Sequence, residues 1–309
     1  MRVLVEKAEA VLSEHTLCTD CLGRMFAGLS GGLTNRDRGR ALLTVLSMEL
    51  YMEILDGGAL NERLLKQLIR RYKMKELERI MLDRGLEMRG RDKQVERCEI
   101  CRGIFEDLGS HTERIVREVG DYEFDTFLIG ISVPTEVEER EDKIRTRHQL
   151  KFAENIRSEL SREVGKHLKE RLKKGFSLNP DLTIHFNPFT QKLRLIPRKI
   201  KMSGKVRLSD PEVQVFAHQC EHCSGKGCSH CNHLGKRGEE SLEYIIGSEV
   251  LKEAEARRWR FGVKRPEEDI VTFTLIIIHP KKKTINLDEV RESAEKRGRG
   301  LFSIEEMTF

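Results

Sequence analysis

The stretch Cys220-Glu-His-Cys-Ser-Gly-Lys-Gly-Cys-Ser-His-Cys231 decides how the rest of this chain is interpreted. It holds half of the eight cysteines in 309 residues, as two Cys-x2-Cys pairs separated by four residues. Two such pairs supply the four thiolates of a tetrahedral Zn2+ site, with Zn–S distances of about 2.3 Å. Gly225 and Gly227 allow the positive φ angles that fold the second pair back on the first. The stretch therefore predicts a zinc site made by Cys220, Cys223, Cys228 and Cys231.

Other interpretations of the cysteines stay open. The four thiols could form two disulfides, could be inert and buried, or could join ligands from elsewhere in the chain. The repeated Cys-x2-Cys spacing favours metal over these alternatives. The remaining cysteines have the same spacing, as Cys18 with Cys21 and Cys98 with Cys101. A long-range site made by these two pairs would connect the two ends of the intervening segment. With the Cys220–Cys231 stretch, we expect one or two zinc ions in the chain.

Composition narrows the class of protein. Charged residues make up 35% of the chain and hydrophobic residues 38%, which indicates a soluble protein with a strongly ionised surface. The net charge is only +5, so a nucleic acid would have to be held by local basic patches. Residues 1–7 lack the apolar core of a signal peptide, and the run Leu275–Ile278 is far shorter than the ~18 residues of a membrane helix. We expect a cytoplasmic protein without a membrane span.

The first third of the chain has helical patterns. Residues 2–14 place apolar side chains at helical spacing. Thr34 with Asp37 resembles a capping box that opens a helix ending at Gly57-Gly58. Two shorter helical patterns follow, around residues 64–69 and 77–81. We predict a helical zinc-binding region over residues 1–120.

Beyond Gly120 the pattern becomes mixed. Residues 124–133 form a compact apolar strand that ends before Pro134, and a charged segment leads into a long helix with a core stripe from Phe152 to Leu172. Two short strands are expected next, and then a helix, a fully buried strand and a final helix. These elements cover residues 182–186, 192–196, 242–251, 271–279 and 287–297. The fold class is α/β (α+β) and multidomain, with regions at 1–120, 121–205 and 206–309.

Six cations within fourteen residues alternate with apolar side chains. In an extended chain this alternation makes one edge basic, and such an edge suits a phosphate backbone. A merely solvated face is the alternative, because few aromatic residues accompany the cations for base stacking. The candidate RNA-binding residues are Arg194, Arg198, Lys199, Lys201, Lys205 and Arg207.

Several stretches resemble one family, the archaeal tRNA pseudouridine synthases that act on the T-loop. In that family a helical zinc region and a THUMP domain precede a synthase core. The resemblance covers nearly the whole chain and is carried by residues 18–26, 32–39, 96–101, 127–134, 161–166 and 220–236. It implies that residues 121–205 are a THUMP-like RNA-binding domain and that residues 206–309 are the four-cysteine cluster with a reduced synthase core. It also implies tRNA as partner, base flipping, and one catalytic aspartate without an organic cofactor.

The catalytic motif of the family is altered in this chain. The family places its aspartate in Gly-Arg-Glu-Asp, whereas the nearest match here is Arg265-Pro-Glu-Glu-Asp269. The Met-Leu-Gly and Gly-Arg-Pro-Phe elements that follow in the family are absent, and forty residues follow Asp269. We therefore expect a truncated, degenerate core in which Asp269 could equally be an ordinary surface carboxylate. No phosphate-binding loop or dinucleotide fingerprint points to ATP or NAD.

Three functions remain open from the sequence. The first is a tRNA-binding protein involved in tRNA pseudouridine modification, working with a separate catalytic subunit or keeping only recognition. The second is an active tRNA pseudouridine synthase that uses Asp269. The third is a zinc-stabilised protein-interaction module. The sequence does not indicate the oligomeric state.

Overall fold

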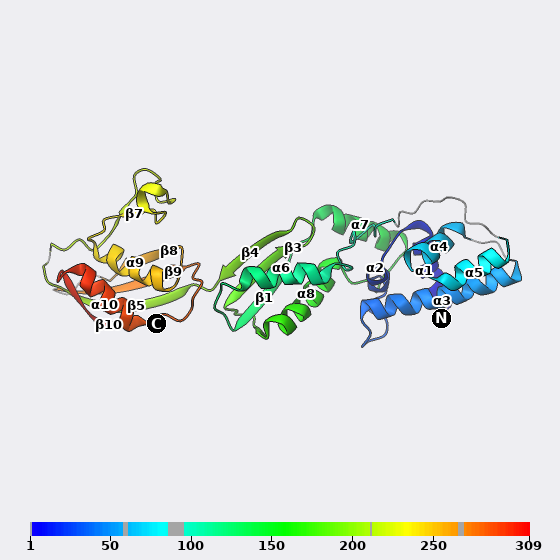
Figure 1. The fold of residues 1–309 in the computed structure, drawn as a ribbon, viewed down its shortest axis with the longest axis horizontal. Coiled ribbons are helices and arrows are strands. Elements are labelled where there is room, and N and C mark those ends of the chain that lie inside the picture. Colours follow the sequence, from blue (N-terminus) through cyan, green and yellow to red (C-terminus); the bar gives the residue numbers. More distant parts are fainter. Residues whose placement is uncertain (1, 58–60, 86–95, 211, 265–268) are drawn as a thin grey trace. The chain divides into compact units, whose positions relative to one another are not determined.

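The computed structural model describes residues 2–57, 61–85, 96–210, 212–264 and 269–309 (Figure 1). The chain divides into two compact units. The first unit comprises Met1–Arg114, Ile129–Arg171 and Phe186–Leu193; the second comprises Ile115–Leu128, Leu172–His185 and Arg194–Phe309. Within the described ranges, no helix combines the length and apolar character needed to cross a membrane.

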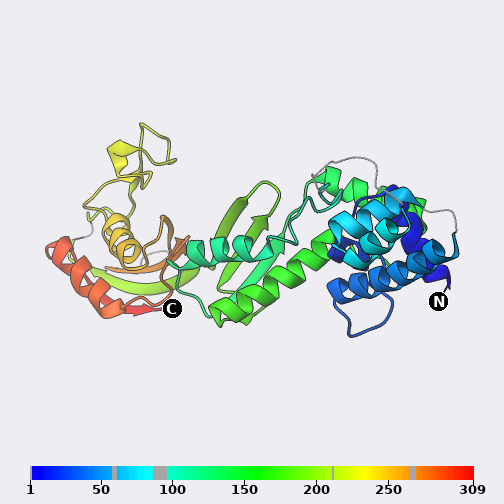
Figure 2. The ribbon, with the colours of Figure 1, turned by 45° about the vertical axis from the view of Figure 1, so that its right-hand side comes forward.

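The first unit begins with helices, as predicted for this region, but the helix over Thr19–Arg24 was not predicted (Figure 2). They are α1 (Arg2–Glu14), α2 (Thr19–Arg24), α3 (Asn35–Asp56), α4 (Glu62–Lys66), a π-helical turn (Gln67–Arg71) and α5 (Lys75–Asp83). The predicted capping of α3 is confirmed, because the Thr34 hydroxyl accepts a hydrogen bond from the Asp37 N–H at 3.1 Å. Gly57 ends α3 with a φ of 73°, as predicted, while Gly58 lies outside the described residues.

Two glycines set the contact between α2 and α3. A Cβ atom on Gly23 would lie 1.7 Å from the Asn35 carbonyl oxygen, and one on Gly39 would lie 2.0 Å from the Thr19 carbonyl oxygen. Neither position has room for a side chain, so the two helices touch through their backbones. This close approach holds the turn that carries Cys18 and Cys21 against α3.

A four-stranded sheet has the order β2-β1-β3-β4. Its strands are β1 (Thr126–Ile131), β2 (Gly175–Phe176), β3 (Leu182–Asn187) and β4 (Lys192–Pro197), with β1 and β2 parallel. The helices of this region are α6 (Leu108–Val119), α7 (Thr135–Arg147) and α8 (Ile156–Leu172). In β3, residues Leu182, Ile184 and Phe186 alternate into the core, which confirms the predicted strand.

The core stripe predicted from Phe152 is wrong at its start. Helix α8 begins at Ile156, and Phe152 is 55% exposed. The reason is a backbone pairing that the helical spacing cannot reveal. The Phe152 carbonyl accepts from the Gly28 N–H at 2.8 Å, and the Glu154 N–H donates to the Arg24 carbonyl at 3.1 Å.

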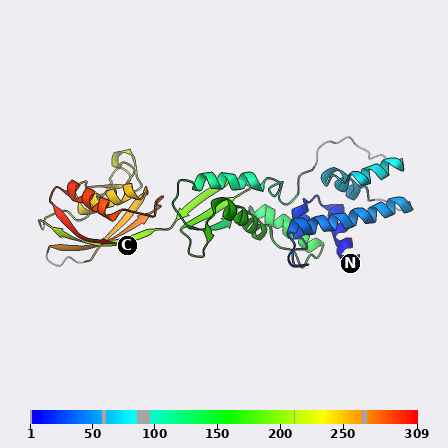
Figure 3. The same ribbon diagram turned by 60° about the horizontal axis from the view of Figure 1, so that its bottom comes forward.

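The second unit contains an antiparallel sheet with the order β10-β5-β9-β8 (Figure 3). Its strands are β5 (Ile200–Leu208), β8 (Arg258–Val263), β9 (Ile270–Ile278) and β10 (Phe302–Thr308). Helices α9 (Leu242–Glu253) and α10 (Leu287–Gly298) pack on one face of the sheet, around a core that includes Val206, Leu275 and Trp259. The expectation that residues 271–279 are buried on both faces is therefore wrong, because alternate residues such as Thr272 and Thr274 are only half-buried.

A short hairpin, β6 (His218–Gln219) with β7 (Lys236–Arg237), precedes α9. The cysteine stretch lies between these two strands, and Cys231 ends a 3-10 turn (Ser229–Cys231). The hairpin thus presents all four cysteines of the stretch from one local structure.

Candidate metal centres and nucleic-acid interface

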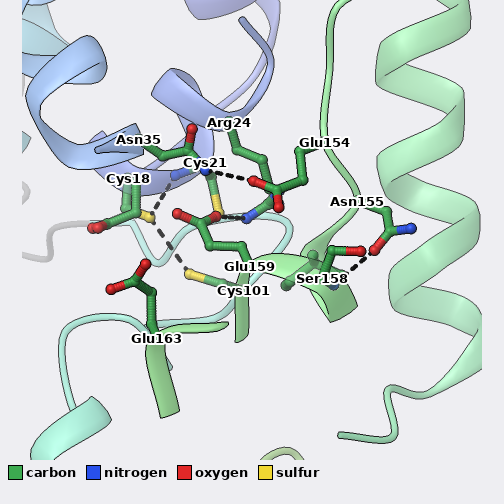
Figure 4. A network of polar contacts seen from close by, with 12 residues as sticks. Cys18, Cys21, Arg24, Asn35, Cys101, Glu154, Asn155, Ser158, Glu159 and Glu163 are labelled. Atoms are coloured by element: carbon green, nitrogen blue, oxygen red, sulfur yellow. Dashed lines mark hydrogen bonds and ion pairs between the residues drawn. The ribbon is translucent and has the colours of Figure 1, made fainter. Parts of the chain in front are cut away.

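The first cysteine centre lies inside the first unit. Ligand atoms of Cys18, Cys21, Cys98 and Cys101 all lie within 4.8 Å of one another, and all four residues are buried. Cys18 is the N-cap of α2, and its sulfur accepts a hydrogen bond from the Cys21 N–H at 3.4 Å. Its sulfur lies 3.5 Å from that of Cys101 (Figure 4). The predicted joining of the two distant pairs is confirmed.

The second cysteine centre is built by the hairpin alone. Its sulfur–sulfur distances are 3.9 Å between Cys220 and Cys228 and 3.8 Å between Cys223 and Cys231. Gly227 has a φ of 95°, and a Cβ atom there would lie 2.5 Å from the His233 carbonyl oxygen. Glycine is therefore required for the turn that brings the two pairs together, as the sequence predicts.

The geometry of both centres suits a tetrahedral ion. Four sulfurs at about 2.3 Å from one ion are separated from each other by about 3.8 Å. The observed separations of 3.5–3.9 Å match this value. They are far longer than a disulfide bond of about 2.05 Å, and all eight cysteines are free thiols, so the disulfide interpretation is wrong. Two four-cysteine clusters that could each hold a metal ion are thus present.

Local hydrogen bonds favour the thiolate form of one cysteine in each centre, whereas the pKa values of Cys18, Cys21 and Cys228 are raised. Hydrogen bonds from the thiols of Cys101, Cys18 and Cys21 hold the pKa of Cys98 well below its ordinary value. In the hairpin, burial opposes ionisation of Cys231, but the N–H groups of Cys228 and Gly235 outweigh it and lower the pKa of Cys231 to about 6. Thiolate is the form that binds metal.

A buried ion-pair network lies directly behind the first centre (Figure 4). The Arg24 side chain is fully buried, and it donates to Glu141 at 2.8 Å and to Glu159 at 2.9 Å. Glu141 also accepts from the Ile156 N–H at 2.9 Å, at the start of α8. One residue of α2 is thereby bonded to both α7 and α8, so the cysteine turn is fixed to these helices.

The six predicted cations do not share one strand. Arg194 is in β4, Arg198 and Lys199 connect the strands, and Lys201, Lys205 and Arg207 are on the exposed side of β5. Three of the six have partners. Lys205 pairs with Glu306 at 3.6 Å, Arg207 pairs with Asp269 at 2.6 Å and with Glu305 at 2.8 Å, and Arg198 donates to the Pro180 carbonyl at 3.1 Å.

The other three cations have neighbours that sequence reasoning missed. Across the sheet, Lys201 faces Ile276 and Ile276 faces Arg260, so Lys201 and Arg260 project from the same face. Burial, and then the positive charges of Arg257, Arg258, Arg194 and Lys199, lower the pKa of His279, which directly follows β9. Within the described ranges, no carboxylate forms an ion pair with any member of this free basic group, defined as Arg194, Lys199, Lys201, Arg257, Arg258 and Arg260.

Asp269 lies in a turn directly before β9. Its carboxylate is 41% exposed and accepts from Arg207, which lowers the pKa of Asp269. Residues 265–268 of the predicted catalytic motif lie outside the described residues. The structure therefore brings one arginine to Asp269, but this arginine comes from β5 and not from the motif.

These features define a class of protein: an α/β protein with two four-cysteine clusters that could each hold a metal ion. A family profile described as the archaeal Pus10 THUMP domain matches residues 111–187. The chain is 32% identical over 301 residues to the tRNA pseudouridine synthase Pus10 of Methanocaldococcus jannaschii, covering 94% of this chain and 64% of that protein.

Two further relatives carry the same name. The Pyrococcus furiosus protein is 27% identical over 304 residues, covering 96% of this chain and 64% of the relative. The Thermofilum pendens protein is 29% identical over 325 residues, covering 99% and 67%. The resemblance predicted from the sequence is confirmed: this chain is similar over nearly its whole length to archaeal proteins named tRNA pseudouridine synthase Pus10, and it spans 64% of the length of the first two.

Proposed function

We propose that this protein binds tRNA and takes part in tRNA pseudouridine modification. The observation that carries the proposal is similarity to named tRNA pseudouridine synthases over 94% of the chain, with a THUMP profile at residues 111–187. The three regions keep their proposed roles: residues 1–120 as the zinc-binding helical region, 121–205 as the THUMP-like domain and 206–309 as the hairpin and reduced core. The proposed place of action is the cytoplasm, with tRNA as partner and a separate catalytic subunit as a further candidate.

Both four-cysteine clusters are proposed zinc sites. Sulfur separations of 3.5–3.9 Å and an all-thiolate donor set support Zn2+ over harder cations. The role is structural, because four protein ligands leave no open position. Metal analysis of purified protein should give two zinc ions per chain from these clusters, and a single ion would contradict the assignment of one of them.

The free basic group is the proposed contact surface for the RNA backbone. Its cations have no carboxylate partner among the described residues, so their charge is available to phosphate. Lys205 and Arg207 are already paired with acidic side chains, and a phosphate would have to displace those acids. This separates the six cations predicted from the sequence into available and occupied ones.

A matched pair of variants tests this surface. The double variant Lys199→Gln with Lys201→Gln should weaken binding of an unmodified tRNA transcript several-fold. The slope of the logarithm of its binding constant against the logarithm of the salt concentration should flatten by about one for each lost phosphate contact. The control, Lys205→Gln with Arg207→Gln, removes the same number of positive charges and should change the slope by less than half as much. Equal effects of the two doubles would overturn the distinction, and no effect of either would place the RNA on another surface.

A second candidate function is catalysis by this chain. The Arg207–Asp269 contact at 2.6 Å supports it, because a catalytic carboxylate needs such positioning. The pairing of Arg207 with Glu305 weakens it, because the same arginine is shared with a second acid. Incubation with unmodified tRNA, followed by mapping of pseudouridine, decides between a role in tRNA binding alone and catalysis by this chain. We expect no product from the chain alone, and product that disappears in Asp269→Ala would establish a synthase.

A further inference from the structure

Two histidines and a glutamate meet where two helices of the first unit end. Glu14 is the last residue of α1, His15 follows it, and His148 is the C-cap of α7. One ring nitrogen of each histidine and a carboxylate oxygen of Glu14 lie within 4.8 Å of one another. The two rings are edge to face, with centroids 5.3 Å apart.

Both histidines have a buried nitrogen without a partner. Nε2 of His15 and Nε2 of His148 are inaccessible to solvent, and neither atom has a hydrogen-bond partner among the described residues. The His148 side chain is only 7% exposed, and its Nε2 lies 3.8 Å from the nearest Glu14 oxygen, too far for a hydrogen bond. An unsatisfied buried polar atom is destabilising. Two such atoms at one place point to a ligand that both nitrogens would bind.

Glu99 determines which nitrogen of His15 is free. One Glu99 oxygen lies 3.0 Å from His15 Nδ1, and the other accepts from the Thr16 N–H at 2.7 Å. A carboxylate can only accept, so Nδ1 carries the proton and donates it. Nε2 of His15 then presents a lone pair. A carboxylate that orients a histidine in this way is the usual outer-shell arrangement of metal-binding imidazoles.

The charges around Glu14, His15 and His148 indicate whether the ligand is a cation or an anion. The carbonyl ends of α1 and α7, each thirteen residues long, favour a cation. Two cations already use these groups: Lys7 donates to the His148 carbonyl at 2.9 Å, and Arg147 pairs with Glu14. The Arg147 side chain is 66% exposed and can leave Glu14 without breaking the core.

We propose that Glu14, His15 and His148 form a third metal centre that binds a divalent transition ion such as Zn2+ or Ni2+. The ligands are Nε2 of both histidines and one oxygen of Glu14, and at least one coordination position remains for water. Imidazole with carboxylate is a donor set that suits these ions, and it differs from the all-thiolate sets of the cysteine centres. The proposal does not depend on tRNA binding.

The test is a titration of untagged protein whose cysteine centres already hold zinc. Adding Ni2+ in a calorimeter should show one further ion per chain. His148→Ala should lower the Ni2+ affinity at least tenfold, and Glu14→Gln should lower it several-fold. The matched control is His185→Ala, which removes an exposed histidine of β3 outside the cluster and should leave the titration unchanged.

Two controls distinguish loss of the third metal centre from loss of the fold. The zinc content of each variant reports whether the cysteine centres, and so the fold, are intact. Since Glu14 is exposed, Glu14→Gln tests the site even if His148→Ala fails to fold. Equal Ni2+ uptake by wild type and Glu14→Gln, or absence of a further ion in the wild type, would overturn the proposal.

Discussion

At the scale of single residues, Arg24 places a buried positive charge inside the first unit. Its guanidinium is fully buried between Glu141 and Glu159, and in the part of the chain that the structure describes its Nη2 has no hydrogen-bond partner. Burial raises the pKa of Glu159, while the positive charge of Arg24 lowers it. The carboxylates thus depend on this arginine for compensation of their charge.

We therefore predict a large effect of Arg24→Met on stability. The change leaves two carboxylates buried without a cation, which should lower the free energy of unfolding by about 3–5 kcal/mol. Urea denaturation followed by circular dichroism measures it. The control Arg157→Met breaks the exposed pair with Glu138 and should cost less than about 1 kcal/mol. Similar losses in both variants would contradict the role of burial.

Asp181 provides a pH-dependent prediction. Burial raises its pKa, but hydrogen bonds from the N–H groups of Asp125 and Thr126 and from the Thr126 hydroxyl outweigh burial and lower the pKa below 3.8. A carboxyl group whose pKa is lowered on folding stabilises the protein above its unfolded pKa, and this contribution is lost as pH falls through the folded pKa.

Asp181→Asn should accordingly cost about 1.5–3 kcal/mol at pH 7, the usual contribution of hydrogen bonds to a charged group. The difference from wild type should shrink as the pH falls below 3.8. Denaturation at a series of pH values measures the trend, with the exposed Asp142→Asn as control. A difference that stays constant down to pH 2 would show that the charge of Asp181 is not what matters.

At the scale of elements, the backbone contact of α2 with α3 is the critical one. Gly39→Ala places a Cβ atom 2.0 Å from the Thr19 carbonyl, so the helices must separate. We expect a loss of several kcal/mol and weaker metal retention at the first cysteine centre, measured by thermal unfolding and metal analysis. Gly109→Ala in α6 meets nothing within 4 Å and should be neutral or stabilising by up to about 1 kcal/mol. A fully stable Gly39→Ala protein would refute the close approach.

Elements with local signals could be predicted from the sequence. Thr34 and Gly57 mark the two ends of α3, and the twelve-residue cysteine stretch specifies its own centre. Strands β8 and β10 were not predicted. In β8, Trp259 is buried while Arg258 and Arg260 are exposed, and the charges that mark its outer face resemble a loop. Such a strand is defined by pairing with β9, which is non-local.

The pairing of the predicted cations could not be read from the sequence either. Arg207 and Lys205 find their acids on β10, about 100 residues later. Their partners are adjacent, Glu305 and Glu306, because the register of β10 shifts between Ile304 and Glu306. A bulge at this position decides which side of the strand each glutamate occupies. The sequence shows the charges but not the bulge.

At the scale of the whole molecule, the two cysteine centres belong to different units. Cys223→Ser should remove one zinc ion and lower hydrogen-exchange protection only around residues 218–237, because that centre is contained in the hairpin. Cys98→Ser should remove the other ion and lower protection across α2 and residues 98–101, which the first centre joins. Metal analysis and hydrogen exchange by mass spectrometry measure both. Loss of both ions in either variant would show that the centres are coupled.

The two centres also differ in when they can form as the chain is synthesised. Cys18 and Cys101 are 83 residues apart, whereas Cys220 and Cys228 are 8 apart. A roughly tenfold longer loop costs about 2 kcal/mol more in closure entropy. The hairpin can capture its ion as soon as its own residues leave the ribosome. Cys18 and Cys21 must instead wait until Cys98 and Cys101 have been synthesised, although all four precede the hairpin in the chain.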